Sequence, residues 1–231
     1  MAEETKDSLS RFHGVKDHFL NKFFYPETIA IVGATQNSIK INFQLMENLV
    51  RLNFQGKVFP INPHADEITG IRAYPRLKDI PERVDIVVTS IPAQKTLEIV
   101  KECAEIGVKQ LVIVTGGFSE GGKRGKELHE EIARLARENS IRVLGPNTLS
   151  PINTANNLVI SFHPVERLKH GGSSPVSSAG LYELRLNSIF SNLGLSKIFD
   201  LGNKMDINEV DALEYLAHDP DTKVIAMHIE S

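Results

Sequence analysis

Residues that could bind a phosphate group follow the first apolar run of the sequence. This run, Thr28-Ile-Ala-Ile-Val-Gly33, is rich in β-branched residues, and the next segment, from Gly33 to Lys40, leads into a predicted helix. Backbone N–H groups at a helix start bind phosphate, and Thr35, Ser38 and Lys40 add two hydroxyls and a cation. The segment therefore predicts a nucleotide site, although a glycine turn without a ligand fits the same residues.

Two familiar nucleotide motifs are excluded at this segment. A nicotinamide dinucleotide site needs three glycines in the first loop and an acidic residue at the end of the second strand. Here the loop contains only Gly33, a later glycine position is Asn42, and the second run ends in Asn62-Pro63-His64. A P-loop is excluded as well, because no Gly-Lys-Ser/Thr sequence follows.

Two further loops carry residues suited to ligand binding. Ser90-Ile91-Pro92 follows the third apolar run, and Thr115-Gly-Gly-Phe-Ser-Glu-Gly-Gly122 follows the fourth. A glycine pair allows a ligand to approach the backbone closely, and we expect Phe118 to be an exposed aromatic surface beside it. With the first two loops, these segments predict an elongated, phosphate-bearing ligand.

The elements that position these loops alternate along the chain. Apolar runs occur at 28–33, 57–61, 84–90, 110–115 and 142–144, and amphipathic helical stretches at 42–53, 94–106 and 122–139. Strands that are apolar on both faces and alternate with helices predict a doubly wound, Rossmann-like α/β domain with a parallel sheet. Ligands of such sheets bind beyond the carboxyl ends of the strands, where these loops would meet.

We expect four segments in the chain. They are an N-terminal extension (1–22) with a short amphipathic helix, a first domain (23–150), an irregular linker (151–172) and a second α/β unit (173–231). The second unit has predicted strands at 175–177, 197–201 and 224–229 and helices at 180–192 and 208–218. A unit of this size buries little surface by itself, so it looks like part of a larger domain.

Composition excludes several classes of function. Lys and Arg total 26 against 29 Asp and Glu, a net charge of -3, which argues against a nucleic-acid partner. No apolar run is long enough to span a bilayer, and a single cysteine without a signal-like N-terminus predicts a cytoplasmic protein. Cys103 lies on an apolar helical stripe and is expected to be a core thiol. The eight histidines form no pattern typical of a metal site, so no metal is expected.

Several unusual segments, in this order, resemble the nucleoside-diphosphate-forming acyl-CoA synthetases. The most similar members are ADP-forming acetate-CoA ligases, which are related to the succinyl-CoA synthetase alpha subunit. The resemblance covers residues 23–231 and rests on Phe23-Phe-Tyr-Pro26, Ile29-Ala-Ile-Val-Gly-Ala34, Pro60-Ile-Asn-Pro63, Thr115-Gly-Gly-Phe-Ser-Glu120, Leu144-Gly-Pro-Asn147, Leu201-Gly-Asn-Lys204 and Asp219-Pro220.

The resemblance implies a Rossmann-like domain that binds coenzyme A. The CoA phosphates would lie on the first loop, the adenosine after the second strand, the pantetheine arm along the third loop and the thiol end at the fourth. In that order, the implied residues are Gly33, Ala34, Thr35 and Lys40, then Asn62 and Pro63, then Ser90, Ile91 and Pro92, then Gly117, Phe118 and Glu120. His64 and Asn42 depart from the family pattern.

For the second unit, the resemblance implies a flavodoxin-like domain with a phosphate site. Ser177 and Gly180 would bind the phosphoryl group, but Ala179 stands where the family has a second serine. Glu230 matches a family glutamate that contacts a phosphorylated histidine, and it is the candidate catalytic residue. The segment with that histidine and the ATP-grasp domain are not found in these 231 residues.

Two classes of function follow. In the first, the chain is the CoA-binding portion of a ligase that interconverts acyl-CoA, ADP and phosphate with acid, ATP and CoA, with an ATP-grasp beta subunit as partner. In the second, it is a CoA-binding protein without ligase activity. A decayed fragment that binds nothing is a third possibility, and homo-oligomerisation is left open.

Overall fold

Five parallel strands form the first sheet of the computed structural model, which describes residues 15–178 and 194–229. The strands are β1 (Thr28–Val32), β2 (Lys57–Ile61), β5 (Ile86–Thr89), β6 (Gln110–Ile113) and β7 (Arg142–Leu144). Their spatial order is β2-β1-β5-β6-β7, and every neighbouring pair is parallel. Each strand lies in a run predicted from the sequence, so the Rossmann-like sheet is confirmed.

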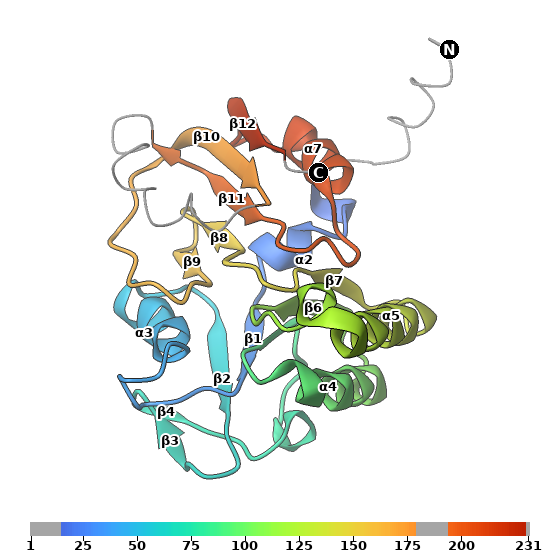
Figure 1. The fold of residues 1–231 in the computed structure, drawn as a ribbon. Helices are drawn as coiled ribbons and strands as arrows, with labels where there is room; N and C mark the ends of the chain where they lie inside the picture. Colours follow the sequence, from blue (N-terminus) through green and yellow to red (C-terminus); the bar gives the residue numbers. More distant parts are fainter. Residues whose placement is uncertain (1–14, 179–193, 230–231) are drawn as a thin grey trace.

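Helices cover both faces of this sheet (Figure 1). They are α3 (Phe43–Arg51), α4 (Ala93–Ile106) and α5 (Gly122–Glu138). Side chains of β1 alternate between two cores: Ile29 and Ile31 pack with α3, whereas Ala30 and Val32 pack with α4 and α5. Because both faces are buried, apolar residues occupy every position of β1 after Thr28.

The second sheet mixes parallel and antiparallel pairs. Its strands, in the order β12-β10-β11-β8-β9, are β12 (Val224–His228), β10 (His170–Ser177), β11 (Lys197–Asp200), β8 (Ile152–Asn153) and β9 (Leu158–Val159). β10 is parallel to β11 and β12, whereas β8 pairs antiparallel with β11 and β9. Residues 151–172 were expected to be irregular, yet they supply β8, β9 and the start of β10. Two-residue strands are too short to show a period in the sequence.

Short elements connect and support the sheets. They are η1 (Val15–Asp17), α2 (Asn21–Phe24), the hairpin of β3 (Glu67–Ile68) and β4 (Ile71–Arg72), η2 (Leu77–Asp79), η3 (Ser119–Gly121) and α7 (Glu209–His218). None of the helices within the described ranges is long and apolar enough to cross a membrane. The expected helix at 180–192, like Gly180 and Glu230, lies outside the described residues.

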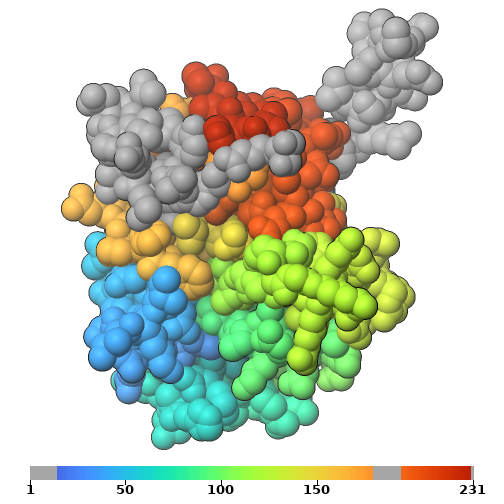
Figure 2. Space-filling view, in the orientation of Figure 1, coloured from blue at the N-terminus to red at the C-terminus, as the bar shows by residue number. Residues whose placement is uncertain are grey.

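The two sheets share one continuous core, and Figure 2 shows the yellow to red segments of the chain lying directly against the blue to green ones. The Phe24 ring lies 4.5 Å from the Phe199 ring and 5.5 Å from the Tyr215 ring, measured between centroids. Arg142, at the start of β7, pairs with Asp206 at 2.7 Å. The segment before β1 therefore packs against β11 and α7, and this packing fixes the position of the second sheet relative to the first.

Candidate functional site

A cleft of about 710 Å³ opens at the carboxyl ends of β1, β2 and β5. Ligands of open parallel sheets bind at this edge. The loops after these three strands line the cleft together with the outer surface of α4. The predicted residues found in its lining are Gly33, Ala34, Thr35, Lys40, Asn62, Pro63, Ser90, Ile91 and Pro92. The structure thus brings three separately predicted loops into one hollow.

The first loop can adopt its path only with glycine at position 33. Gly33 has a φ of +83°, and a Cβ there would lie 2.8 Å from Ile91 Cγ2 and 3.0 Å from Ser90 Oγ. An L side chain would be both strained and blocked by these atoms. The backbone of the first loop therefore packs directly on the third loop at the base of the cleft.

Two asparagine side chains hold the loops together. Asn42 donates from Nδ2 to the Gly33 carbonyl oxygen at 2.5 Å, and the same nitrogen lies 3.4 Å from Ser90 Oγ. Asn62 donates from Nδ2 to the Ala34 carbonyl oxygen at 2.9 Å. Asn42, which departs from the family pattern, thus has a positioning role. The hydrogen bonds fix the shape of the cleft without a ligand.

Most of the ionisable side chains in the cleft are not among the site residues predicted from the sequence. Its ionisable side chains are Lys40, His64, Arg76, Lys95, Lys101, Glu98, Glu102 and Glu105. Lys95, Glu98, Glu102 and Glu105 are three or four positions apart, which places them along one side of α4. This spacing was a usable signal. No such sequence signal exists for Arg76, because its place in the cleft lining depends on a tertiary contact.

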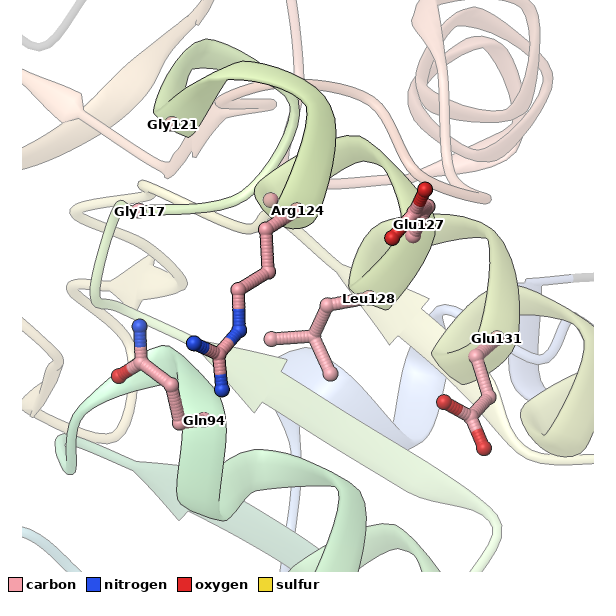
Figure 3. A pocket seen from close by; sticks show the side chains of 8 residues that line it. Gln94, Gly117, Gly121, Arg124, Glu127, Leu128 and Glu131 are labelled. Atoms are coloured by element: carbon pink, nitrogen blue, oxygen red, sulfur yellow. The ribbon is translucent and has the colours of Figure 1, made fainter.

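Four predicted residues lie outside the lining of this cleft: Ser38, Gly117, Phe118 and Glu120. Gly117 lines a smaller pocket of about 290 Å³ with Gln94, Arg124 and Leu128. Figure 3 shows Arg124 of α5 pointing toward Gln94 at the start of α4. The fourth loop therefore opens on a separate hollow around the start of α4.

Phe118 corrects one expectation, because its ring is fully buried and not an exposed surface. The ring belongs to the same core as Val100 and Ile132. The loop lies against α5 at Gly125, where a Cβ would come 2.0 Å from the Phe118 carbonyl oxygen. Burying a phenyl ring stabilises the fold by about 1.5–3 kcal/mol relative to leaving it exposed. The ring therefore packs in the core and offers no surface to a ligand.

Glu120 is exposed, yet its carboxylate organises the fourth loop. Oε1 accepts a hydrogen bond from Gly117 N at 2.7 Å, and Oε2 accepts one from Asn203 Nδ2 at 2.6 Å. Burial raises the pKa of Glu120, but hydrogen bonds from the amides of Glu120, Gly117 and Phe118 and from Asn203 outweigh it. The pKa therefore lies below its ordinary value.

In the second unit, Ser177 lies buried at the carboxyl end of β10, and Asp200 is its register partner on β11. Burial raises the pKa of Asp200 to about 6, against the amides of Gly202 and Leu149, which lower it. An ionised carboxylate at this position opposes the binding of phosphate near Ser177. Asp200 was not among the predicted site residues, although an acidic residue within the predicted strand 197–201 was a visible signal.

Cys103 is fully buried, and burial raises its thiol pKa far above the ordinary value. The prediction that Cys103 is a core thiol is therefore confirmed. A thiol with such a raised pKa is a poor nucleophile. Within the described ranges, no group of three or more His, Cys, Asp or Glu side chains is arranged to hold a metal ion.

Comparison with known proteins identifies the family. Residues 27–153, more than half of the chain, match the family model described as CoA binding domain. The chain belongs to this family. Residues 175–231 match the model described as succinyl-CoA ligase like flavodoxin domain. The protein thus has the CoA-binding and ligase-like portions of the ADP-forming acyl-CoA synthetases, in the expected order.

Individual relatives extend over most of this CoA-binding-domain protein. The ADP-forming acetate-CoA ligase of Methanocaldococcus jannaschii is 40% identical over 93% of this chain and 30% of its own length. The alpha subunit of ADP-forming acetate-CoA ligase II of Pyrococcus furiosus is 35% identical, and the match covers 91% of this chain and 46% of the subunit. One similar solved structure is that of the dinucleotide-forming acetyl-coenzyme A synthetase 1 of Ca. Korarchaeum cryptofilum in complex with phosphate and ADP. It is 38% identical with a TM-score of 0.86, and the match covers 92% of this chain and 46% of the solved one. The chain spans less than half the length of each.

Proposed function

We propose that the cleft between β1, β2 and α4 binds coenzyme A as a substrate. The observation that carries this proposal is that three predicted loops line one hollow of about 710 Å³ in a CoA-binding domain. The CoA phosphates would lie on the loop from Gly33 to Lys40, the adenosine beside Asn62 and Pro63, and the pantetheine arm along Ser90-Ile91-Pro92. The amides of the first loop and the Lys40 ammonium would bind phosphate oxygens.

The same cleft is unsuited to a nicotinamide dinucleotide. The first loop offers one glycine, and Asn42 fills the position of a later one with a side chain that bonds the Gly33 carbonyl. None of the three residues directly after β2 carries a carboxylate, and in NAD-binding domains an acidic residue at the end of this strand binds the ribose hydroxyls. CoA should therefore bind more tightly than NAD.

Calorimetric titration of the 231-residue chain with CoA and with NAD tests the proposal. Lys40→Ala should weaken CoA binding by about 1–2 kcal/mol, since it removes a charge-assisted hydrogen bond. Lys126→Ala is the matched control, because Lys126 is exposed on α5 and does not line the cleft. Tighter binding of NAD than of CoA would contradict the proposal, and so would equal effects of the two substitutions.

The larger activity we propose is that of an ADP-forming acid-CoA ligase, in which this chain supplies the CoA-binding portion. The reaction converts acyl-CoA, ADP and phosphate into acid, ATP and CoA. Relatives named as alpha subunits support an ATP-grasp beta subunit as partner, and relatives named as acetate-CoA ligases support acetate as the acid. The cytoplasm is the expected location.

A CoA-binding protein without ligase activity is the second candidate, and Asp200 favours it. A buried carboxylate beside Ser177 weakens the expected phosphate site. An assay of ADP release from ATP, acetate and CoA, run with this chain and an ATP-grasp protein that also supplies the phosphohistidine segment, separates the two candidates. ADP release that depends on both proteins supports the ligase, whereas CoA binding without ADP release supports the second candidate.

A further inference from the structure

One end of the cleft is formed by two segments that run side by side beyond the first sheet. Ile61, the last residue of β2, forms a parallel bridge with Tyr74. Tyr74 N donates to the Pro60 carbonyl oxygen at 2.9 Å, and Asn62 N donates to the Tyr74 carbonyl oxygen at 3.0 Å. The chain after Tyr74 therefore follows the outer edge of β2 in the same direction.

This alignment places the side chains of His64 and Arg76 near the end of β2. Arg76 comes two residues after Tyr74, and His64 comes three residues after Ile61. Both His64 and Arg76 line the cleft. His64 N donates to Asn62 Oδ1 at 2.9 Å, and Asn62 in turn donates to Ala34 in the first loop. The turn after β2 and the proposed phosphate loop are thus parts of one hydrogen-bonded unit.

Arg76 retains most of its hydrogen-bonding capacity. Its Nε lies 3.4 Å from Asp79 Oδ2, and the side chain is 59% exposed. Within residues 15–178 and 194–229, its terminal NH1 and NH2 groups have no hydrogen-bond partner. A guanidinium group in this state can still present two parallel N–H donors to a phosphate.

The position after the second strand has a defined role in dinucleotide-binding sheets, because it meets the adenosine ribose. An acidic residue there binds free ribose hydroxyls, and an arginine accommodates a phosphate on the ribose. In this chain none of the three residues after β2 carries a carboxylate, and Arg76 supplies a cation at this end of the cleft. The arrangement thus fits a phosphorylated ribose, and CoA carries a phosphate on its ribose 3′ oxygen.

We infer that Arg76, assisted by His64, binds the ribose 3′-phosphate of CoA and makes the cleft select CoA over dephospho-CoA. The inference rests on the proposed function, since it assumes that the cleft binds CoA. It adds a specificity-determining residue that the sequence reading did not select.

Titration of the full chain with CoA and with dephospho-CoA, which lacks only the 3′-phosphate, tests this role. The unaltered chain should bind CoA at least about tenfold more tightly, the value of one charge-assisted contact. Arg76→Gln should weaken CoA binding by about tenfold and leave dephospho-CoA within about twofold. Arg72→Gln is the matched control, because Arg72 lies over the Tyr74 ring at 5.3 Å and does not line the cleft.

Each other outcome overturns a specific statement. Equal affinity of the unaltered chain for the two ligands would overturn the inference and leave the proposed function intact. Equal weakening of both ligands by Arg76→Gln would show that Arg76 only supports the fold, and would also overturn it. If neither ligand binds to a chain that is folded by circular dichroism, the proposed function itself fails.

Discussion

Asn203 donates a hydrogen bond from Nδ2 to Glu120 Oε2 at 2.6 Å, although the two residues lie 83 positions apart. Glu120 belongs to the loop after β6, and Asn203 belongs to the loop after β11. The second carboxylate oxygen of Glu120 accepts the Gly117 amide. One charged group therefore joins the fourth loop of the CoA-binding domain to the second sheet.

Glu120→Gln should destabilise the chain by about 0.5–1.5 kcal/mol at pH 7, because a neutral amide is a weaker acceptor than a carboxylate. The folded pKa of Glu120 is lowered, so its contribution is complete above the ordinary pKa of 4.5 and is lost as the pH falls through the folded pKa. Urea unfolding at pH 7 and pH 3 measures the difference. Glu127→Gln, at an exposed α5 residue, is the control. A difference that persists unchanged at pH 3 would contradict the role of the charge.

Gly33→Ala should weaken CoA binding and cost about 1–3 kcal/mol of stability, because a strained φ is combined with a contact to Ile91. Gly70→Ala separates the two effects. Gly70 has a similar φ of +77°, but a Cβ there would meet no atom within 4 Å. Thermal unfolding and CoA titration of both variants give the comparison. Equal CoA affinity in both would mean that the loop contact at Gly33 is unimportant for binding.

The sequence was sufficient where a residue's role is set by its neighbours in the chain. The β-branched run that forms β1 and the glycine that ends it could be read directly, and so could the apolar stripe containing Cys103. The expectation for Phe118 was wrong, because its burial depends on how α4 and α5 pack together around the ring. Arg76 was missed for the same kind of reason, since the bridge between Ile61 and Tyr74 determines its position.

Asp200 should make stability fall as the pH rises. Its folded pKa is about 6 and its ordinary value is 3.8, so the folded protein binds this proton more tightly than the unfolded chain does. The contribution is therefore present below pH 3.8 and is lost as the pH rises to about 6, a change of about 3 kcal/mol. Asp200→Asn should remove this dependence.

Unfolding free energies of the two proteins at pH 4 and pH 7 test this prediction. The difference between them isolates Asp200 from the other carboxylates of the chain. Relative to the unaltered protein, the variant should be more stable at pH 7 than at pH 4. A constant difference across this range would mean that Asp200 keeps an ordinary pKa in the folded state.

Lys197 and Asp219 form a fully buried ion pair, with 2.8 Å between Nζ and Oδ2. Tyr25 connects the pair to the segment before β1: its ring lies 5.1 Å from Lys197 Nζ, and its hydroxyl donates to Asp221. Burial lowers the pKa of Lys197, but the hydrogen bonds that its ammonium donates to Asp219 and Tyr25 outweigh this effect and raise the pKa above its ordinary value, so the ammonium stays charged.

Asp219→Ala should therefore cost about 3–5 kcal/mol, because it leaves the buried Lys197 charge with only the partly exposed Asp221 carboxylate, at 3.5 Å, as an ion-pair partner. Adding Lys197→Met should recover much of that loss, since the double variant buries no uncompensated charge. Glu138→Ala is the control: it breaks the exposed pair with Arg134 and should cost about 0–1 kcal/mol. Urea unfolding of these three variants and of the unaltered chain gives the four unfolding free energies to compare. If Asp219→Ala costs no more than Glu138→Ala, the buried pair contributes no more to stability than an exposed one.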